Sequence, residues 1–378
     1  MWTIVNWIIF IAASAELVYM GYKYSGIAGS EDEAGFLLAG RSLGVFVGAC
    51  TLVATGFSGW CFMGSPGVAY QFGTVELLAN FFFAFAIVIA SLFFAGFLRR
   101  RAGELGCHTI PEYVALQHGN GSWKKVLQAV AAIMSILLLL VFLMGQIKAV
   151  GLLCSRWLNI PMVPAALIMI SLIIFYTTTG GLAAVAWTDS VMIVGMLFGT
   201  VIILFQIFGD IGLAEMVSKL REVDPNLVSP KTGAPYGETK LGPFMLIPYA
   251  FLWAGVLPYM CIRFLALKPG LKLHKLGLLA AVFSIVLSLI PIVGIYMRIK
   301  MPGLSDADQA MPEYLNNFLH PGWAAVITLC ILFAMKSTVD SILHTVSSAV
   351  SYDLRQALFA HKNISPKGAV KINRIAVV

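Results

Sequence analysis

The sequence predicts an all-α membrane protein that crosses the bilayer several times. Of its 378 residues, 59% are hydrophobic and only 11% are charged, and the mean hydropathy is +0.88. Soluble domains carry roughly 25% charged residues, so this composition excludes a soluble fold. Apolar runs long enough to cross a bilayer as helices recur along the chain. The net charge of +7 is explained by basic loops on one side of a membrane and requires no nucleic acid.

Windows of about 19 residues predict where the helices of this single domain, residues 1–378, lie. The first helix, roughly 2–20, lacks the basic start and the small-residue cleavage site of a signal peptide, so we interpret it as a retained leading span. A ninth core helix begins near residue 372. The eight core helices between these two lie at roughly 44–70, 75–98, 126–154, 161–178, 187–209, 243–265, 275–297 and 322–350.

Lysine and arginine set the expected orientation. Most of them fall into loops that are cytoplasmic if the N-terminus lies outside, among them the clusters at 99–101 and 355–374 and Arg263 at the end of helix 243–265. We therefore expect a multi-pass protein of the cell (inner) membrane with its N-terminus outside. The six cysteines show no metal or disulfide spacing and are interpreted as small apolar side chains.

Helix 322–350 contains a row of polar side chains inside an otherwise apolar span. Ser337, Thr338 and Ser341 are spaced so that their hydroxyls can share one face, and Lys336 and Asp340 are four residues apart and can pair. The simple interpretation is that the hydroxyls bond to carbonyls one turn earlier. Ionisable groups at this depth are costly, at about 2.5–3.5 kcal/mol each, and favour a second interpretation, an ion or solute pathway.

Helix 44–70 is interrupted by Gly56, Gly59 and the pair Pro66-Gly67. Such a break frees backbone carbonyls, which at membrane depth must be buried in protein or line a cavity. Freed carbonyls suit a small cation, although a kinked packing helix is the alternative. A second weak point, at Gly255 to Pro258, lies in helix 243–265. Two broken helices separated by four intact ones indicate two inverted halves of five helices each.

A third segment, from Tyr176 to Asp189, joins the fourth and fifth core helices. The pair Gly180-Gly181 is expected to end helix 161–178 sharply, and Asp189 then lies near the start of helix 187–209. Asp189 is interpreted either as a helix cap or as a carboxylate that serves the cation pathway.

Taken together, these segments resemble the sodium:solute symporter family, which includes bacterial proline, pantothenate, sialic acid and galactose symporters and the animal sodium–glucose cotransporters. The similarity spans essentially the whole chain, and the bacterial proline symporters are nearest around Arg41 to Gly44 and Ser58 to Trp60. The matching segments in chain order are Phe36–Gly44, Ser58–Trp60, Met63–Gly67, Ile110–Tyr113, Tyr176–Asp189, Arg263–Ala266, Ser337–Ser341, Ser347–Ala349 and Asp353–Leu354.

The resemblance implies a leucine-transporter-like inverted-repeat fold with an extra N-terminal helix. The spans contain no His, Asp or Glu cluster with metal or acid–base spacing, so we expect the protein not to be an enzyme and to hold no cofactor. The implied partners are a small organic solute, the lipid bilayer and sodium as the coupling ion. The family's sodium ligands correspond to the carbonyls of Ala54, Phe57 and Ala334 and to the hydroxyls of Ser337 and Thr338. A second sodium site, which only some members have, corresponds to Asp189, Asp340 and Ser341.

By the same resemblance, the solute lies at the midplane between the two broken helices and helix 126–154. We expect the solute to be an amino acid such as proline, or a carboxylate or vitamin. Lys148 either faces the cavity, which predicts a solute carboxylate, or extends to the headgroups. The candidate contacts are Phe57, Ser58, Gln146, Trp253, Tyr259 and Lys148.

Three departures from the family pattern matter. Lys336 stands beside Ser337, where a fixed ammonium within ~6 Å of sodium costs several kcal/mol, so it must turn away, pair with Asp340, lose its proton or replace sodium. Gly56 stands where proline-type members carry an aspartate. Core helices 9 and 10 are missing, so we expect a chain truncated after core helix 8. The alternatives to sodium symport are a transporter-like membrane sensor and a proton-coupled or sodium-independent transporter in which Lys336 replaces the cation.

Overall fold

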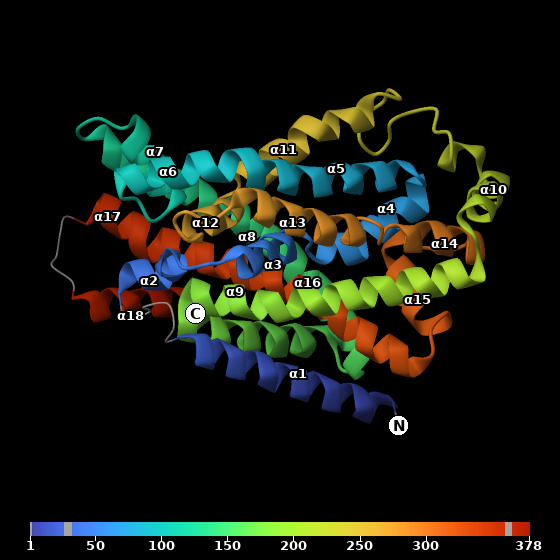
Figure 1. Cartoon of the computed structure of the whole chain (residues 1–378). Helices are drawn as coiled ribbons and strands as arrows, with labels where there is room; N and C mark the ends of the chain where they lie inside the picture. The colour runs from blue at the N-terminus through green and yellow to red at the C-terminus, as the bar shows by residue number, and fades with distance from the viewer. Residues whose placement is uncertain (1, 26–31, 360–364) are drawn as a thin grey trace.

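The computed structural model describes residues 2–25, 32–359 and 365–378, and it is a bundle of helices aligned along one direction (Figure 1). The helix α1 lies along one edge of the bundle, and the N-terminus shares an end with α10 and α14, while α7, α17 and α18 lie at the other end (Figure 1). Six helices of the described part are long and apolar enough to cross a membrane, or up to eight if each of two bent pairs is one span.

The long helices coincide with the apolar windows in the middle of the chain. Shorter helices lie between these long ones. The first group is α1 (Trp2–Ser25), α2 (Glu33–Leu38), α3 (Val45–Gly56), α4 (Ser65–Phe72), α5 (Val75–Ile89), α6 (Ala95–Leu105), α7 (Ile110–His118), α8 (Trp123–Leu158) and α9 (Met162–Asp210). The second group is α10 (Leu213–Val223), α11 (Leu246–Val256), α12 (Pro258–Ala266), α13 (Leu273–Leu287), α14 (Ile292–Lys300), α15 (Ala310–Asn317), α16 (Pro321–Ser348), α17 (Arg355–Leu358) and α18 (Pro366–Val377).

Both interrupted spans break at the glycine and proline segments that the sequence indicates. The helix α3 ends at Gly56, and the chain resumes at Trp60 and runs into α4 at an angle of 52°. Phe57 in between is non-helical, with φ −89° and ψ 85°. The second break bends by 54° at Leu257, where Pro258 can open α12 because a first-turn residue needs no helical hydrogen bond.

The expected sharp end of helix 161–178 at Gly180-Gly181 is confirmed, because α9 consists of two helices that meet in a kink at Gly181. The only non-helical residue within α9 is Gly181, with φ 56° and ψ −149°. This backbone conformation is open essentially to glycine alone, so one residue turns the chain without a loop. A side chain there would also collide with α2, since an added Cβ would lie 2.5 Å from the carbonyl oxygen of Phe36.

Several short helices lie outside the apolar windows. The polar segment 210–242, interpreted from sequence as a loop, contains α10, and the segment before helix 322–350 contains α15. The last helix, α18, begins at Pro366, before the expected start near 372. Helices of this length and polarity are invisible to a membrane-length window, because that window averages over about 19 residues.

The helix α16 forms the centre of the bundle. Within its most apolar window 83% of the residues are buried, against 22% for α8 and 28% for α1. The helices α1, α3, α8 and α9 all pack against it. Its polar side chains are therefore surrounded by protein and do not face lipid, which is the arrangement expected of a functional polar helix.

Replacing Gly181 with alanine should destabilise the fold. The strained conformation alone costs a non-glycine residue about 1–3 kcal/mol, and the contact with Phe36 adds to it. Thermal unfolding of the purified protein in detergent should show a clear drop in Tm. Gly209→Ala is the matched control, because it lies in the same helix with nothing within 4 Å of its added Cβ. Equal melting temperatures for the two variants would contradict the structural role of Gly181.

Candidate functional site

The broken end of α3 meets the middle of α16. Because α3 stops at Gly56, its last carbonyl groups have no partner within the helix. The hydroxyl of Ser337 donates to the carbonyl of Ala54 at 2.8 Å, and the hydroxyl of Thr338 donates to the carbonyl of Thr55 at 3.2 Å. Two segments far apart in sequence therefore meet through backbone and hydroxyl oxygens.

The same two hydroxyls also reach one turn back along α16. Ser337 and Thr338 lie 3.0 and 3.3 Å from the carbonyl of Ala334. A hydroxyl has one proton, so each of these side chains divides its donation between α3 and its own helix. All of these residues are buried, and the neutral oxygens of Ala54, Ala334, Ser337 and Thr338 form a compact set suited to a hard monovalent cation.

Lys336 turns toward α1 and not toward Asp340. Its side chain is fully buried, and its Nζ lies 5.6 Å from the centre of the Phe10 ring. No hydrogen-bond partner of Nζ occurs in residues 2–25, 32–359 and 365–378. Of the alternatives left open by the sequence, pairing with Asp340 is absent from the ion pairs of the described residues, and Asp340 instead accepts a hydrogen bond from Tyr176 at 2.8 Å.

A second group of buried polar residues surrounds Arg263 and consists of Thr51, Asp189, Asp340 and Ser341. Arg263 is fully buried on α12, so its assignment from sequence to a cytoplasmic loop is wrong. Its guanidinium lies 3.8 Å from the carboxylate of Asp189 and donates to the hydroxyl of Ser341. It also donates to Thr51 at 3.2 Å and to the carbonyl of Tyr259 at 2.5 Å. A basic residue just before the end of an apolar window looks like a loop anchor, and only the bend at Leu257 turns it inward.

Hydroxyl groups connect Arg263 to the carboxylates of Asp189 and Asp340. They also connect it to Thr55, next to the oxygens at the end of α3. Thr51 donates to Asp189 at 2.6 Å, and Ser341 donates to Asp340 at 3.2 Å. Thr55 and Ser341 lie 3.0 Å apart through their hydroxyls. The candidate residues of the second site, Asp189, Asp340 and Ser341, are thus brought together, with the Arg263 guanidinium among them. Sequence reasoning missed Thr51, Thr55 and the carboxylate partner Tyr176.

The candidate solute contacts fall at the two breaks, and α8 joins them. Gln146 accepts a hydrogen bond from the backbone N–H of Gly59 at 3.2 Å, beside Ser58. One turn earlier on the same helix, Phe142 packs against Tyr259, with ring centres 6.2 Å apart. One face of α8 therefore contacts both broken helices.

At the second break, Trp253 and Tyr259 lie edge to face, with ring centres 6.1 Å apart. The ring of Tyr259 is buried, and its hydroxyl has no hydrogen-bond partner in the described part of the chain. A buried, unpaired phenol next to an unwound backbone is a ready hydrogen-bond donor or acceptor for a bound molecule.

Lys148 lies in the last third of α8, before its end at Leu158. Its side chain is exposed, and its charge acts on Asp308, in the segment before α15. Burial and the neighbouring Asp306 raise the pKa of Asp308, and Lys148 opposes that rise. Asp308 in turn lies against the broken span, since a Cβ added at Gly67 would be 2.9 Å from its carboxylate. Lys148 thus has Asp308 as an acidic neighbour, beside the broken span formed by α3 and α4.

Comparison with known proteins gives one consistent result. The model of the Sodium:solute symporter family matches residues 36–378. The high-affinity proline transporter PutP of Bacillus subtilis is 26% identical over 356 residues, which cover 91% of this chain and 72% of that protein. The sodium/pantothenate symporter of Haemophilus influenzae is 28% identical over 327 residues, which cover 84% of this chain and 65% of that protein.

Among solved structures, a Na⁺-coupled sialic acid symporter in a substrate-bound outward-open state superposes with a TM-score of 0.79 at 17% identity. The match covers 99% of this chain and 79% of that one. The chain therefore has the leucine-transporter-like fold, and the expectation drawn from the sequence motifs is confirmed at the level of fold.

Removing the Arg263 guanidinium should destabilise the protein strongly. Arg263→Gln leaves the buried carboxylate of Asp189 without its cation, which typically costs about 3–5 kcal/mol. Adding Asp189→Asn to that variant should restore part of the loss, because the uncompensated charge is then gone. Thermal unfolding in detergent measures both effects. Lys219→Gln, which removes the exposed ion pair with Glu215, is the control and should leave Tm unchanged. A double variant no more stable than Arg263→Gln would contradict the compensation.

Proposed function

The chain belongs to the sodium:solute symporter family, which consists of membrane transporters and not of enzymes, and we propose that it is a secondary active transporter that couples sodium entry to symport of a small organic solute by alternating access. The coupling ion binds between α3 and α16. Its five ligands are the carbonyls of Ala54, Phe57 and Ala334 and the hydroxyls of Ser337 and Thr338.

The hydrogen bond from Ser337 to the carbonyl of Ala54 is the observation that carries this proposal. Sodium entering between the two oxygens takes a lone pair from each, and the hydroxyl proton rotates away. All five ligands are neutral, so the ion is held firmly enough to join the two helices and weakly enough to leave again. This balance is what a transport site requires.

Alternating access follows from which elements the ion joins. The domain, residues 1–378, is read as two inverted repeats, the first from α3 to the end of α9 and the second beginning at α11, with α1 outside both. Because α3 and α16 belong to different repeats, an ion bound between them favours the conformation in which the repeats are closed on each other. Loss of the ion frees α3 to move.

The group of Asp189, Asp340 and Ser341 is the candidate for a second cation. A cation can reach Ser341 only by displacing the Arg263 guanidinium, which already donates to that hydroxyl. We therefore assign one coupling ion to the conformation described, and a second ion to a conformation in which Arg263 has moved.

The solute is held at the two breaks by Phe57, Ser58, Gln146, Trp253 and Tyr259. The relatives named above are transporters of proline and pantothenate, and an amino acid such as proline or a carboxylate or vitamin is the class proposed here. The unpaired hydroxyl of Tyr259 then donates to an oxygen of the solute. The excess of basic residues in alternate loops favours an N-terminus outside the cell membrane.

Uptake into proteoliposomes tests the sodium site. An inward sodium gradient should drive accumulation of labelled proline or pantothenate. Ser337→Ala and Thr338→Ala should each raise the sodium concentration for half-maximal uptake about tenfold, since an interaction with a charged partner is worth about 1.5 kcal/mol. Thr200→Ala is the control, because that hydroxyl bonds only within its own helix, to the carbonyl of Met196. Unchanged sodium dependence in both site variants would exclude this ion site.

The fully buried Lys336 favours one competing function, sodium-independent or proton-coupled transport. Because its Nζ contacts Phe10 of α1, we expect Lys336→Met to keep sodium-dependent uptake, with stability equal to or above that of the wild type. Lys268→Met, at an exposed position, is the control. Wild-type uptake that ignores sodium and becomes sodium-dependent in Lys336→Met would establish the competing function instead.

A further inference from the structure

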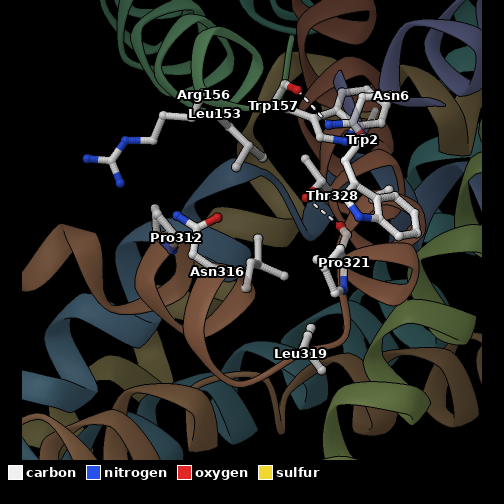
Figure 2. Close-up of a pocket in the computed structure, with 13 residues that line it drawn as sticks. Trp2, Asn6, Leu153, Arg156, Trp157, Pro312, Asn316, Leu319, Pro321 and Thr328 are labelled. Atoms are coloured by element: carbon white, nitrogen blue, oxygen red, sulfur yellow. Dashed lines mark hydrogen bonds between the residues drawn. The ribbon is translucent and has the colours of Figure 1, made fainter. Parts of the chain in front are cut away.

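A cavity of about 210 Å³ lies at the end of the bundle where the chain begins (Figure 2). Four helices form its walls: the start of α1, the end of α8, the helix α15 and the start of α16. None of the residues proposed for sodium or solute lines it. It is a separate site, and the transport proposal gives it no role.

Two buried polar atoms at this cavity lack partners. Trp157 is only 7% exposed, and its Nε1–H has no hydrogen-bond acceptor among the described residues. The side chain of Asn6 donates through Nδ2 to the backbone carbonyl of Trp157 at 2.7 Å, while its Oδ1 has no donor in the described part of the chain (Figure 2). Buried polar groups are normally paired, so a donor and an acceptor left open at one cavity indicate a ligand that offers the complementary pair.

The charges around the cavity favour an anionic group with a donor attached. Arg156 lines the cavity and is paired only loosely, at 3.6 Å from Glu313, with both side chains partly exposed. The helix α16 begins at the cavity with Pro321, so the positive end of its dipole lies there. Arg156, the indole N–H of Trp157 and this helix end suit phosphate oxygens. Asn6 and Glu313 suit an ammonium or a hydroxyl.

The position of the cavity indicates where such a ligand comes from. Trp2 and Trp157 line it, and Trp323 and Trp7 lie on the same ends of α16 and α1. Clustered tryptophans mark the level at which membrane headgroups lie.

We propose that this cavity binds the headgroup of a glycerophospholipid that carries a hydrogen-bond donor, such as phosphatidylethanolamine. Its phosphodiester oxygens accept from Trp157 and Arg156, and its ammonium donates to Asn6. A water-soluble phosphate ester has the same polar chemistry but is not held at the headgroup level that the tryptophans mark, which is why the lipid is favoured.

Native mass spectrometry of the full chain, purified in detergent and titrated with defined lipids, tests the proposal. Phosphatidylethanolamine should bind as a resolved adduct. Phosphatidylcholine should bind about fivefold more weakly, because its quaternary ammonium has no N–H for Asn6, and the loss of one hydrogen bond has about this effect. Equal binding of the two lipids would overturn the assignment of the donor to Asn6.

The variants locate the site. Trp157→Phe keeps the ring but removes the open N–H, and Arg156→Gln removes an exposed charge, so both should lower lipid binding about fivefold. Trp7→Phe is the matched control, because its indole N–H is already paired with the carbonyl of Leu158 at 3.2 Å. Wild-type lipid binding in both cavity variants would overturn the site. Should Trp157→Phe fail to fold, Arg156→Gln alone decides.

A competition experiment distinguishes a membrane lipid from a water-soluble phosphate ester as the ligand of the cavity. Phosphoethanolamine, which has the headgroup without acyl chains, should not displace the bound lipid at millimolar concentration. Displacement at that concentration would identify the ligand as a water-soluble phosphate ester and overturn the lipid proposal.

Discussion

The structure depends on satisfying the backbone that α3 leaves open inside the membrane. A helix that stops at Gly56 in the middle of a span has carbonyls that neither lipid nor its own helix can satisfy. The hydroxyls of Ser337 and Thr338 supply the hydrogen bonds, and they can do so because α16 is surrounded by other helices over most of its length. The break in one helix and the burial of another are therefore one structural solution, and neither is stable without the other.

Two buried cations on neighbouring helices are handled in opposite ways. Arg263 has carboxylate, hydroxyl and carbonyl partners, and its planar fork uses several of them at once. Among the described residues, the Nζ of Lys336 lacks a hydrogen-bond partner and lies over the face of the Phe10 ring. The difference follows from position: Arg263 lies where α3, α9 and α16 all present polar groups, whereas Lys336 faces the leading helix α1. The region beside Ser337 is consequently left to the neutral oxygens.

Sequence alone predicted the elements that rest on local chemistry. Apolar windows predicted the long spans, and glycine and proline segments predicted both breaks and the kink at Gly181. The spacing of Ser337 and Thr338 to Ser341 predicted the shared face. It failed where tertiary packing decides. Arg263, assigned from sequence to a loop, turns inward because of the bend at Leu257. The direction of Lys336 depends on where α1 docks, and no local pattern encodes that.

The leading helix connects the cavity to the cation site through direct contacts. The ring of Phe10 packs edge to face on Trp157, with centres 6.3 Å apart, and its face meets Lys336. Lys336 is the neighbour of Ser337 on α16, so two side-chain contacts and one peptide bond separate the cavity from an ion ligand. A ligand that orders Trp157 restricts Phe10, and Phe10 is the sole aromatic face against Lys336 in the described residues. If the packing of α1 differs between the two states of the transport cycle, the cavity and the ion site are linked thermodynamically, and each changes the affinity of the other by the same factor.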